Sequence, residues 1–93
     1  MRVLIVDDET RARSLLKTIV TENCPKVTEL FEAEDLAAGV ASINKNKIDL
    51  VFLDVEMPGY AGTQLLDFFD PEDINFEIVF TTAYSEYALK AFD

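Results

Sequence analysis

Acidic side chains follow apolar segments at two places in this sequence. In VFLDVEMPG, Asp54 ends an apolar run and Glu56 comes two positions later. Asp7 and Asp8 directly follow an aliphatic run near the N-terminus, and Thr82 is the second of two threonines after a third apolar run. Carboxylates that lie close together repel one another, and a hard divalent cation such as Mg²⁺ relieves this repulsion. Because a carboxylate beside such a cation can attack phosphorus, the pattern predicts a phosphoryl-transfer site with Asp54 as the nucleophile.

Each of these residues also has a purely structural interpretation. Asp7 and Asp8 precede a predicted helix and could cap its N-terminus. Asp54 could form the turn that contains Pro58–Gly59, and Thr82 could cap a later helix. The functional interpretation is favoured because the polar groups stand at matching ends of three apolar runs, in chain order.

The elements that would position these residues alternate along the chain. Four apolar runs are predicted as strands: Val3–Val6, Val27–Ala33, Ile48–Leu53 and Phe76–Phe80. Four helices are predicted to follow them: Thr10 to about Glu22, a second from the N-cap Asp35 to about 44–46, Thr63–Phe69, and a last one after Ser85. Such uniformly apolar strands are typical of a parallel sheet that is buried on both faces by helices.

The sequence therefore predicts an α/β domain with a doubly wound parallel sheet. In the flavodoxin-like strand order 2-1-3-4, the first and third strands are neighbours. Ligands of open α/β sheets bind outside the carboxyl ends of the strands, where the winding direction reverses. The carboxylates of Asp7, Asp8 and Asp54 would then meet in that crevice.

Composition excludes several classes of function. The 93 residues have a formal net charge of −10, which argues against direct nucleic-acid binding by this segment. The absence of histidine excludes His-based acid–base catalysis. Cys24 is the only cysteine, so no internal disulfide can form, and neither a leader nor a membrane span is evident. A cytoplasmic protein is expected. The first turn, DDETRAR, has no glycine, which disfavours a dinucleotide-binding fold.

Three segments carry a family resemblance. VLIVDDE, LVFLDVEMPG and VFTTAYSEYALKAF resemble the receiver domain of two-component response regulators, the CheY-like fold, and the likeness extends over residues 1–93. The C-terminal segment is most similar to receivers of LytTR-type transcriptional regulators. The resemblance implies phosphorylation by a sensor histidine kinase and control of transcription through an output domain. The implied site residues are the phosphoryl acceptor Asp54, the Mg²⁺ ligands Asp7, Asp8, Asp54 and the Glu56 backbone carbonyl, and the phosphate-binding switch residues Thr82 and Ala83.

One departure from the family pattern affects both the chemistry and the fold. Family receivers have five βα units, whereas this sequence is predicted to have four, so it is expected to be truncated before the fifth strand and helix. The lysine that ends the fifth strand is then missing, and Lys90 lies in the predicted last helix. We expect metal binding to persist and phosphorylation to be weakened. We also expect the Phe76–Phe80 strand to be an open edge, leading to self-association or a domain swap.

Two alternatives belong to other functional classes. A phosphohydrolase of the haloacid-dehalogenase type also uses an Asp nucleophile with Mg²⁺ and an acid two residues later. Here the second acid is Glu56 and the nucleophile follows the third strand, and both facts argue against that class. The other alternative is an interaction module whose acids are structural. A receiver would not be an enzyme in the usual sense, because it catalyses at most its own phosphotransfer and dephosphorylation.

Overall fold

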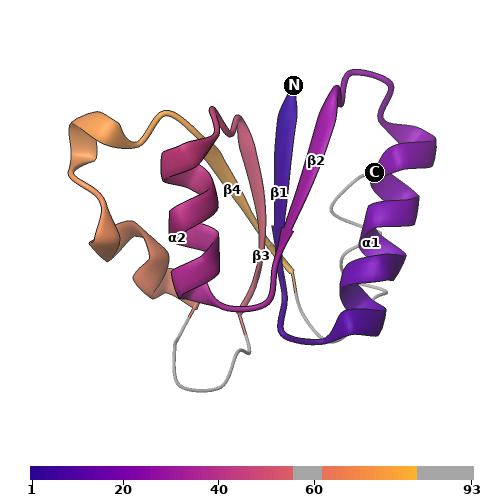
Figure 1. The fold of residues 1–93 in the computed structure, drawn as a ribbon, viewed down its shortest axis with the longest axis horizontal. Helices are drawn as coiled ribbons and strands as arrows, with labels where there is room; N and C mark the ends of the chain where they lie inside the picture. Colours follow the sequence, from indigo (N-terminus) through magenta and orange to yellow (C-terminus); the bar gives the residue numbers. More distant parts are fainter. Residues whose placement is uncertain (56–61, 82–93) are drawn as a thin grey trace.

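The computed structural model of the protein describes residues 1–55 and 62–81 (Figure 1). The described elements, in chain order, are β1 (Arg2–Val6), α1 (Thr10–Asn23), β2 (Glu29–Ala33), α2 (Leu36–Lys45), β3 (Leu50–Asp54), the 3-10 helices η1 (Gly62–Phe68) and η2 (Pro71–Asp73), and β4 (Glu77–Thr81). The predicted strands are all present, with ends shifted by one or two residues. The last predicted helix, after Ser85, lies outside the described residues.

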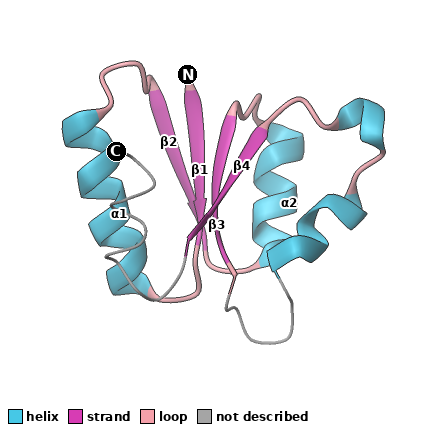
Figure 2. Ribbon diagram, turned by 180° about the vertical axis from the view of Figure 1, so that it is seen from behind, coloured by secondary structure: helices cyan, strands magenta, loops and turns pink. Residues whose placement is uncertain are grey.

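The four strands form one parallel sheet in the order β2-β1-β3-β4, as the sequence predicted. Helix α1 covers one face of the sheet, while α2 and the 3-10 segments lie on the other (Figures 1 and 2). The connection through α1 therefore runs on one face of the sheet and the connection through α2 on the other, so the winding direction reverses beside β1. The C-terminal ends of β1 and β3 stand side by side, because Val6 pairs with Leu53 in the register.

The two central strands are the best buried. Every residue of β1 and β3 after the first is buried, whereas β2 and β4 each keep exposed positions. The expected burial on both faces holds for β1 and β3, the open edge expected for the Phe76–Phe80 strand is confirmed, and the outer strands of the described sheet are β2 and β4. Each has a hydrogen-bonded neighbour strand on one side only within the described sheet. Phe80 of β4 is 45% exposed.

Two apolar clusters, one on each face of the sheet, hold the layers together. Under α1, Leu16 and Val20 pack with sheet residues that include Phe52. On the α2 face, Leu36 of the helix packs with strand residues and with Leu65 from η1. Cys24 is half-buried and packs as a small apolar side chain against the first cluster.

Helix α2 begins where the sequence predicted and lies close to β1. The Asp35 side chain caps the helix, since its Oδ1 accepts a hydrogen bond from the Ala38 N–H at 2.7 Å. A Cβ atom on Gly39 would lie 3.1 Å from Val6 Cγ2, so the absence of a side chain permits this close approach. No helix in the described part of the chain is both long enough and apolar enough to span a membrane.

The segment after β3 differs from its prediction. The sequence predicted a short helix over Thr63–Phe69, and the spacing of Leu65, Leu66 and Phe69 puts these three side chains on one side of it. A 3-10 helix forms instead over Gly62–Phe68. Leu65 is fully buried, but Leu66 is 41% exposed, so the expected apolar stripe contributes less to the core than its sequence suggests.

Candidate functional site

Asp7 is held directly after the end of β1. Its backbone N–H donates to the Ala33 carbonyl at 3.0 Å, which extends the β1–β2 pairing by one residue. Its side-chain Oδ1 accepts a hydrogen bond from the Glu9 N–H at 2.9 Å. The side chain thus organises the turn into α1, and Asp7 is only 9% exposed, whereas Asp8 is exposed.

Asp54 is the last residue of β3 and is 6% exposed. It pairs in register with Thr81 of β4, and the next residue, Val55, donates its N–H to the Thr81 carbonyl at 3.1 Å. The backbone on both sides of Asp54 is therefore fixed by sheet pairing. The Asp54 carboxylate therefore lies at the carboxyl end of β3, a central strand of the sheet.

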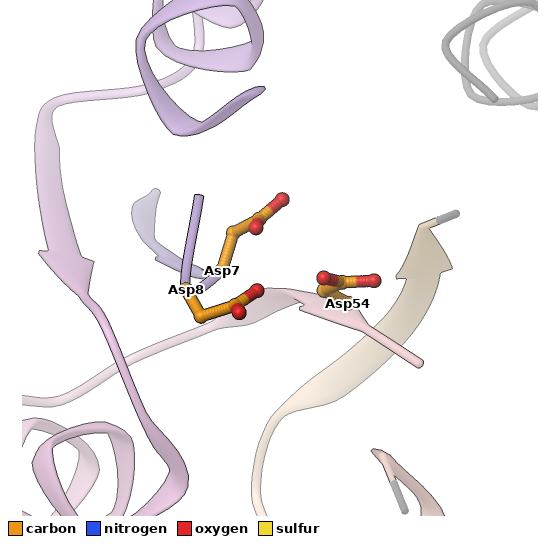
Figure 3. Close-up of side chains that lie close together, drawn as sticks. All are labelled: Asp7, Asp8 and Asp54. Atoms are coloured by element: carbon orange, nitrogen blue, oxygen red, sulfur yellow. The ribbon is translucent and has the colours of Figure 1, made fainter. Parts of the chain in front are cut away.

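The three aspartates converge in space although 46 positions separate Asp8 from Asp54. One carboxylate oxygen from each of Asp7, Asp8 and Asp54 lies within 4.8 Å of the other two. Figure 3 shows the three side chains gathered where β1 and β3 end. The prediction that these acids meet at the carboxyl edge of the sheet is confirmed.

The pKa of the Asp7 carboxyl is raised from 3.8 to about 6. Burial is the largest cause, since the charged form loses hydration; the negative charge of Asp54 and the interaction between the two carboxyls raise it further. The hydrogen bond from the Glu9 N–H opposes these effects. The sequence pattern predicted repulsion between these carboxylates, and the structure adds that burial is the larger cause of the raised pKa of Asp7.

This donor set fits a hard divalent cation. Carboxylate oxygens are the preferred ligands of Mg²⁺, and opposite ligands bound at about 2.1 Å lie about 4.2 Å apart. Adjacent ligands lie about 3 Å apart, so the three carboxylate oxygens, which lie within 4.8 Å of one another, are near enough to share one ion after small side-chain adjustments. The remaining predicted site atoms and groups, the Glu56 carbonyl, Thr82 and Ala83, lie outside the described residues.

Comparison with known proteins decides the family. The sequence model of the response regulator receiver domain matches residues 3–93. The chain belongs to the response regulator receiver family. This membership confirms the resemblance drawn from the three motif segments, and it places the protein among signalling modules of two-component systems.

Two curated relatives align with the whole of this receiver chain. An uncharacterized response regulatory protein of Vibrio cholerae is 40% identical, and the transcriptional regulatory protein BtsR of Escherichia coli is 38% identical, each over 93 residues. The chain spans 38% of the length of either relative.

Solved receiver structures share the fold. The response regulator TrrA of Thermotoga maritima, crystallised in complex with Mg²⁺-BeF, is 35% identical with a TM-score of 0.75, over 92% of this chain and 72% of TrrA. The signal receiver domain of a LuxO repressor homologue from Vibrio parahaemolyticus is 27% identical, also with a TM-score of 0.75, over 98% of this chain and 69% of that one.

One residue that supports the receiver site was missed by the sequence analysis. The Arg13 Nη1 atom donates a hydrogen bond to the Asp7 carbonyl at 2.7 Å, although Arg13 lies in α1. The available signal was its place one turn into the helix that follows the two acids. Nothing in that spacing shows which way the guanidinium points, so the contact emerges only from the packing of α1 on the sheet.

Proposed function

We propose that this receiver domain accepts a phosphoryl group on Asp54 from a sensor histidine kinase, in a reaction that depends on Mg²⁺. Phosphorylation would change partner binding and so control transcription through an output domain. The observation that carries the proposal is the convergence of the Asp7, Asp8 and Asp54 carboxylates within 4.8 Å at the carboxyl edge of the sheet.

Asp7, Asp8 and Asp54, together with the Glu56 backbone carbonyl, would hold the Mg²⁺ ion. The complex of TrrA with Mg²⁺-BeF supports this assignment in a relative of the same fold. When bound, Mg²⁺ supplies positive charge that offsets the crowded carboxylates and the incoming phosphoryl oxygens. The raised pKa of Asp7 agrees with a site whose negative charges are not balanced by nearby positive charge in the metal-free protein.

The Asp54 carboxylate would act as the nucleophile. One of its oxygens would form a bond to phosphorus while the bond from phosphorus to the kinase histidine nitrogen breaks. The electron pair of that bond returns to the imidazole ring, and the product on Asp54 is an acyl phosphate. Because Asp54 is buried at a fixed strand end, little conformational freedom is lost as the donor approaches.

The response to phosphorylation would involve the residues directly after β4. The Thr82 hydroxyl would hydrogen-bond a phosphoryl oxygen, and Ala83 would leave room beside it. β4 is paired with β3 up to Asp54 and Thr81, so Thr82 follows the strand residue that is the register partner of the phosphoryl acceptor. The name of BtsR, a transcriptional regulatory protein, supports a transcriptional output.

Intact-protein mass spectrometry after incubation with acetyl phosphate and Mg²⁺ tests the central step. The wild type is expected to gain one phosphoryl group, and chelation of Mg²⁺ should suppress the gain. The Asp54→Ala variant should gain none, while the matched control Asp70→Ala, which removes an exposed aspartate from outside the site, should react as the wild type does.

Equal modification of the wild type and Asp54→Ala would show that Asp54 is not the acceptor. Catalytic hydrolysis of an aryl phosphate would instead support a phosphohydrolase of the haloacid-dehalogenase type. A wild type that shows no phosphoryl gain and no Mg²⁺-dependent change in thermal midpoint would favour an interaction module with structural acids.

We also propose that two copies of the chain associate through β4. Within the described sheet, β4 pairs with β3 on one side and has no strand on its other side. An edge strand offers backbone N–H and C=O groups to a second chain. Phe80, 45% exposed, adds apolar surface to the same strand.

A further inference from the structure

We propose that Arg13 is a positioning residue for the acidic site. Its guanidinium holds the Asp7 carbonyl and so sets the separation of the Asp8 carboxylate from those of Asp7 and Asp54. The inference rests on the proposed Mg²⁺ site and adds to it a residue that binds neither metal nor phosphate. Its role is to keep the ligands close together before the cation arrives.

The Arg13 side chain joins three elements. From α1, its Nη1 donates to the Asp7 carbonyl at the end of β1, at 2.7 Å. Its Nε lies 3.4 Å from Oε1 of Glu32 in β2, and the Arg13 side chain is only 15% exposed. A short, charge-assisted hydrogen bond in a largely buried place is among the stronger polar contacts.

The contact completes the fixation of Asp7. The Asp7 N–H is bonded to the Ala33 carbonyl, and its Oδ1 accepts from the Glu9 N–H. With Arg13 on its carbonyl, every polar group of the Asp7 backbone is engaged. Because the peptide bond is planar, fixing the Asp7 carbonyl also fixes the direction in which the chain reaches the Asp8 Cα atom. The exposed side chain of Asp8 therefore extends from a backbone position that these hydrogen bonds hold in place.

The effect of Arg13 on the site is mainly geometric, although its charge strengthens the hydrogen bond to the Asp7 carbonyl. Glu32 compensates that charge, and it also accepts a hydrogen bond from Lys17 Nζ at 3.4 Å. A planar guanidinium can donate to the Asp7 carbonyl and to the Glu32 carboxylate at the same time, through separate N–H groups. The ammonium group of lysine lacks this planar, forked arrangement of donors. The orienting function therefore favours arginine at this position.

Calorimetric titration of Mg²⁺ into the chain tests the inference. Arg13→Gln is expected to weaken Mg²⁺ binding about tenfold, the low end of what loss of an outer-shell partner costs. Arg13→Lys, which keeps a charged donor at the end of a long side chain, should recover part of the affinity. Lys17→Gln is the matched control, because it removes a cation from the same ion-pair group without touching Asp7. It should bind Mg²⁺ like the wild type.

Amide hydrogen exchange of the metal-free variants provides a readout that does not need the cation. The Asp7 and Glu9 amides, which are bonded around the site, should exchange faster in Arg13→Gln than in the wild type. The Asn46 amide at the end of α2 should keep its rate, which shows that the fold is intact.

The outcomes separate this inference from the proposed function. If the wild type binds Mg²⁺ and Arg13→Gln binds it equally well, or if Lys17→Gln loses as much affinity, the positioning role is refuted. If the wild type itself binds no Mg²⁺, the metal site is refuted, and hydrogen exchange decides the positioning role alone. Faster exchange confined to the Asp7 and Glu9 amides supports it, and unchanged exchange refutes it.

Discussion

The Asp7 carboxyl is buried at the end of β1 beside the carboxylate of Asp54. Its pKa is raised, so the metal-free folded protein holds this proton more tightly than the unfolded chain does. The contribution of Asp7 to stability is therefore fully present below about pH 4 and is lost as the pH rises through about 6. Above that range the folded protein carries a buried negative charge that burial and Asp54 disfavour.

Asp7→Asn should stabilise the metal-free protein at about pH 8, where Asp7 is ionised in both folded and unfolded states. A pKa shift of this size predicts an increase in the free energy of unfolding of about 1–3 kcal/mol. The increase should disappear towards about pH 4, because Asp7 is then protonated in the folded state. Urea denaturation with a chelator present measures both limits.

A matched control is Asp67→Asn, which removes an exposed carboxylate in η1, away from the cluster. It should change stability little at either pH. An Asp7→Asn variant that is no more stable than the wild type at the higher pH would contradict the unfavourable ionisation of Asp7. Added Mg²⁺ should reverse the ranking, because the variant lacks a ligand oxygen that carries full charge.

Among the elements, α2 packs closely against β1 at Gly39. Gly39 faces Val6 so closely that even a Cβ atom would lie 3.1 Å from Val6 Cγ2. Val6 is fully buried and belongs to the strand that leads into Asp7. A larger side chain at residue 39 must therefore displace the helix or the strand that carries the site.

Gly39→Val is expected to lower the free energy of unfolding by about 1–3 kcal/mol, the usual cost of overpacking a core. Ala41→Val introduces the same side chain at an exposed position of the same helix and should cost only the lower helix propensity of valine, below about 0.7 kcal/mol, whereas propensity alone would slightly favour Gly39→Val. Denaturant unfolding of both variants measures the difference. A Gly39→Val variant at least as stable as the wild type would show that α2 does not press on β1.

Element prediction from sequence succeeded where a segment has one strong pattern. The runs around β1 and β3 are uniformly apolar, and both became central strands. It was less successful after β3, where an apolar spacing predicted a helix with Leu66 on its apolar side and a 3-10 helix with Leu66 exposed formed. The apolar spacing of a short segment does not show which surface the segment will pack against. Which of its side chains become buried depends on that surface.

At the scale of the whole molecule, the open side of β4 predicts concentration-dependent assembly. Sedimentation velocity at micromolar concentrations should show a species larger than a monomer. Phe80→Lys places a charge on the edge strand, the device by which natural sheets avoid edge pairing, and should shift the population towards the monomer. A wild type that remains monomeric over this range would refute the association.

The matched control for assembly is Leu15→Lys. Leu15 is 50% exposed on α1, so this substitution removes a comparable exposed apolar side chain and makes the same change in net charge. It should leave the association unchanged. An equal loss of assembly in both variants would show that charge in general, and not the β4 edge, governs it.

From the sequence alone follow the parallel α/β class, the position of each acid at the end of an apolar run, and the family to which the motifs belong. These features are local, because neighbouring residues in the sequence determine where a strand forms, how long it is and which residue ends it. Only the tertiary structure decided that Asp7, Asp8 and Asp54 come within 4.8 Å, that burial chiefly raises the pKa of Asp7, and that Arg13 holds the Asp7 carbonyl. Those facts depend on which strands and helices become neighbours. Crossover connections bring distant segments together, and the hydration that each group loses is set by everything packed around it.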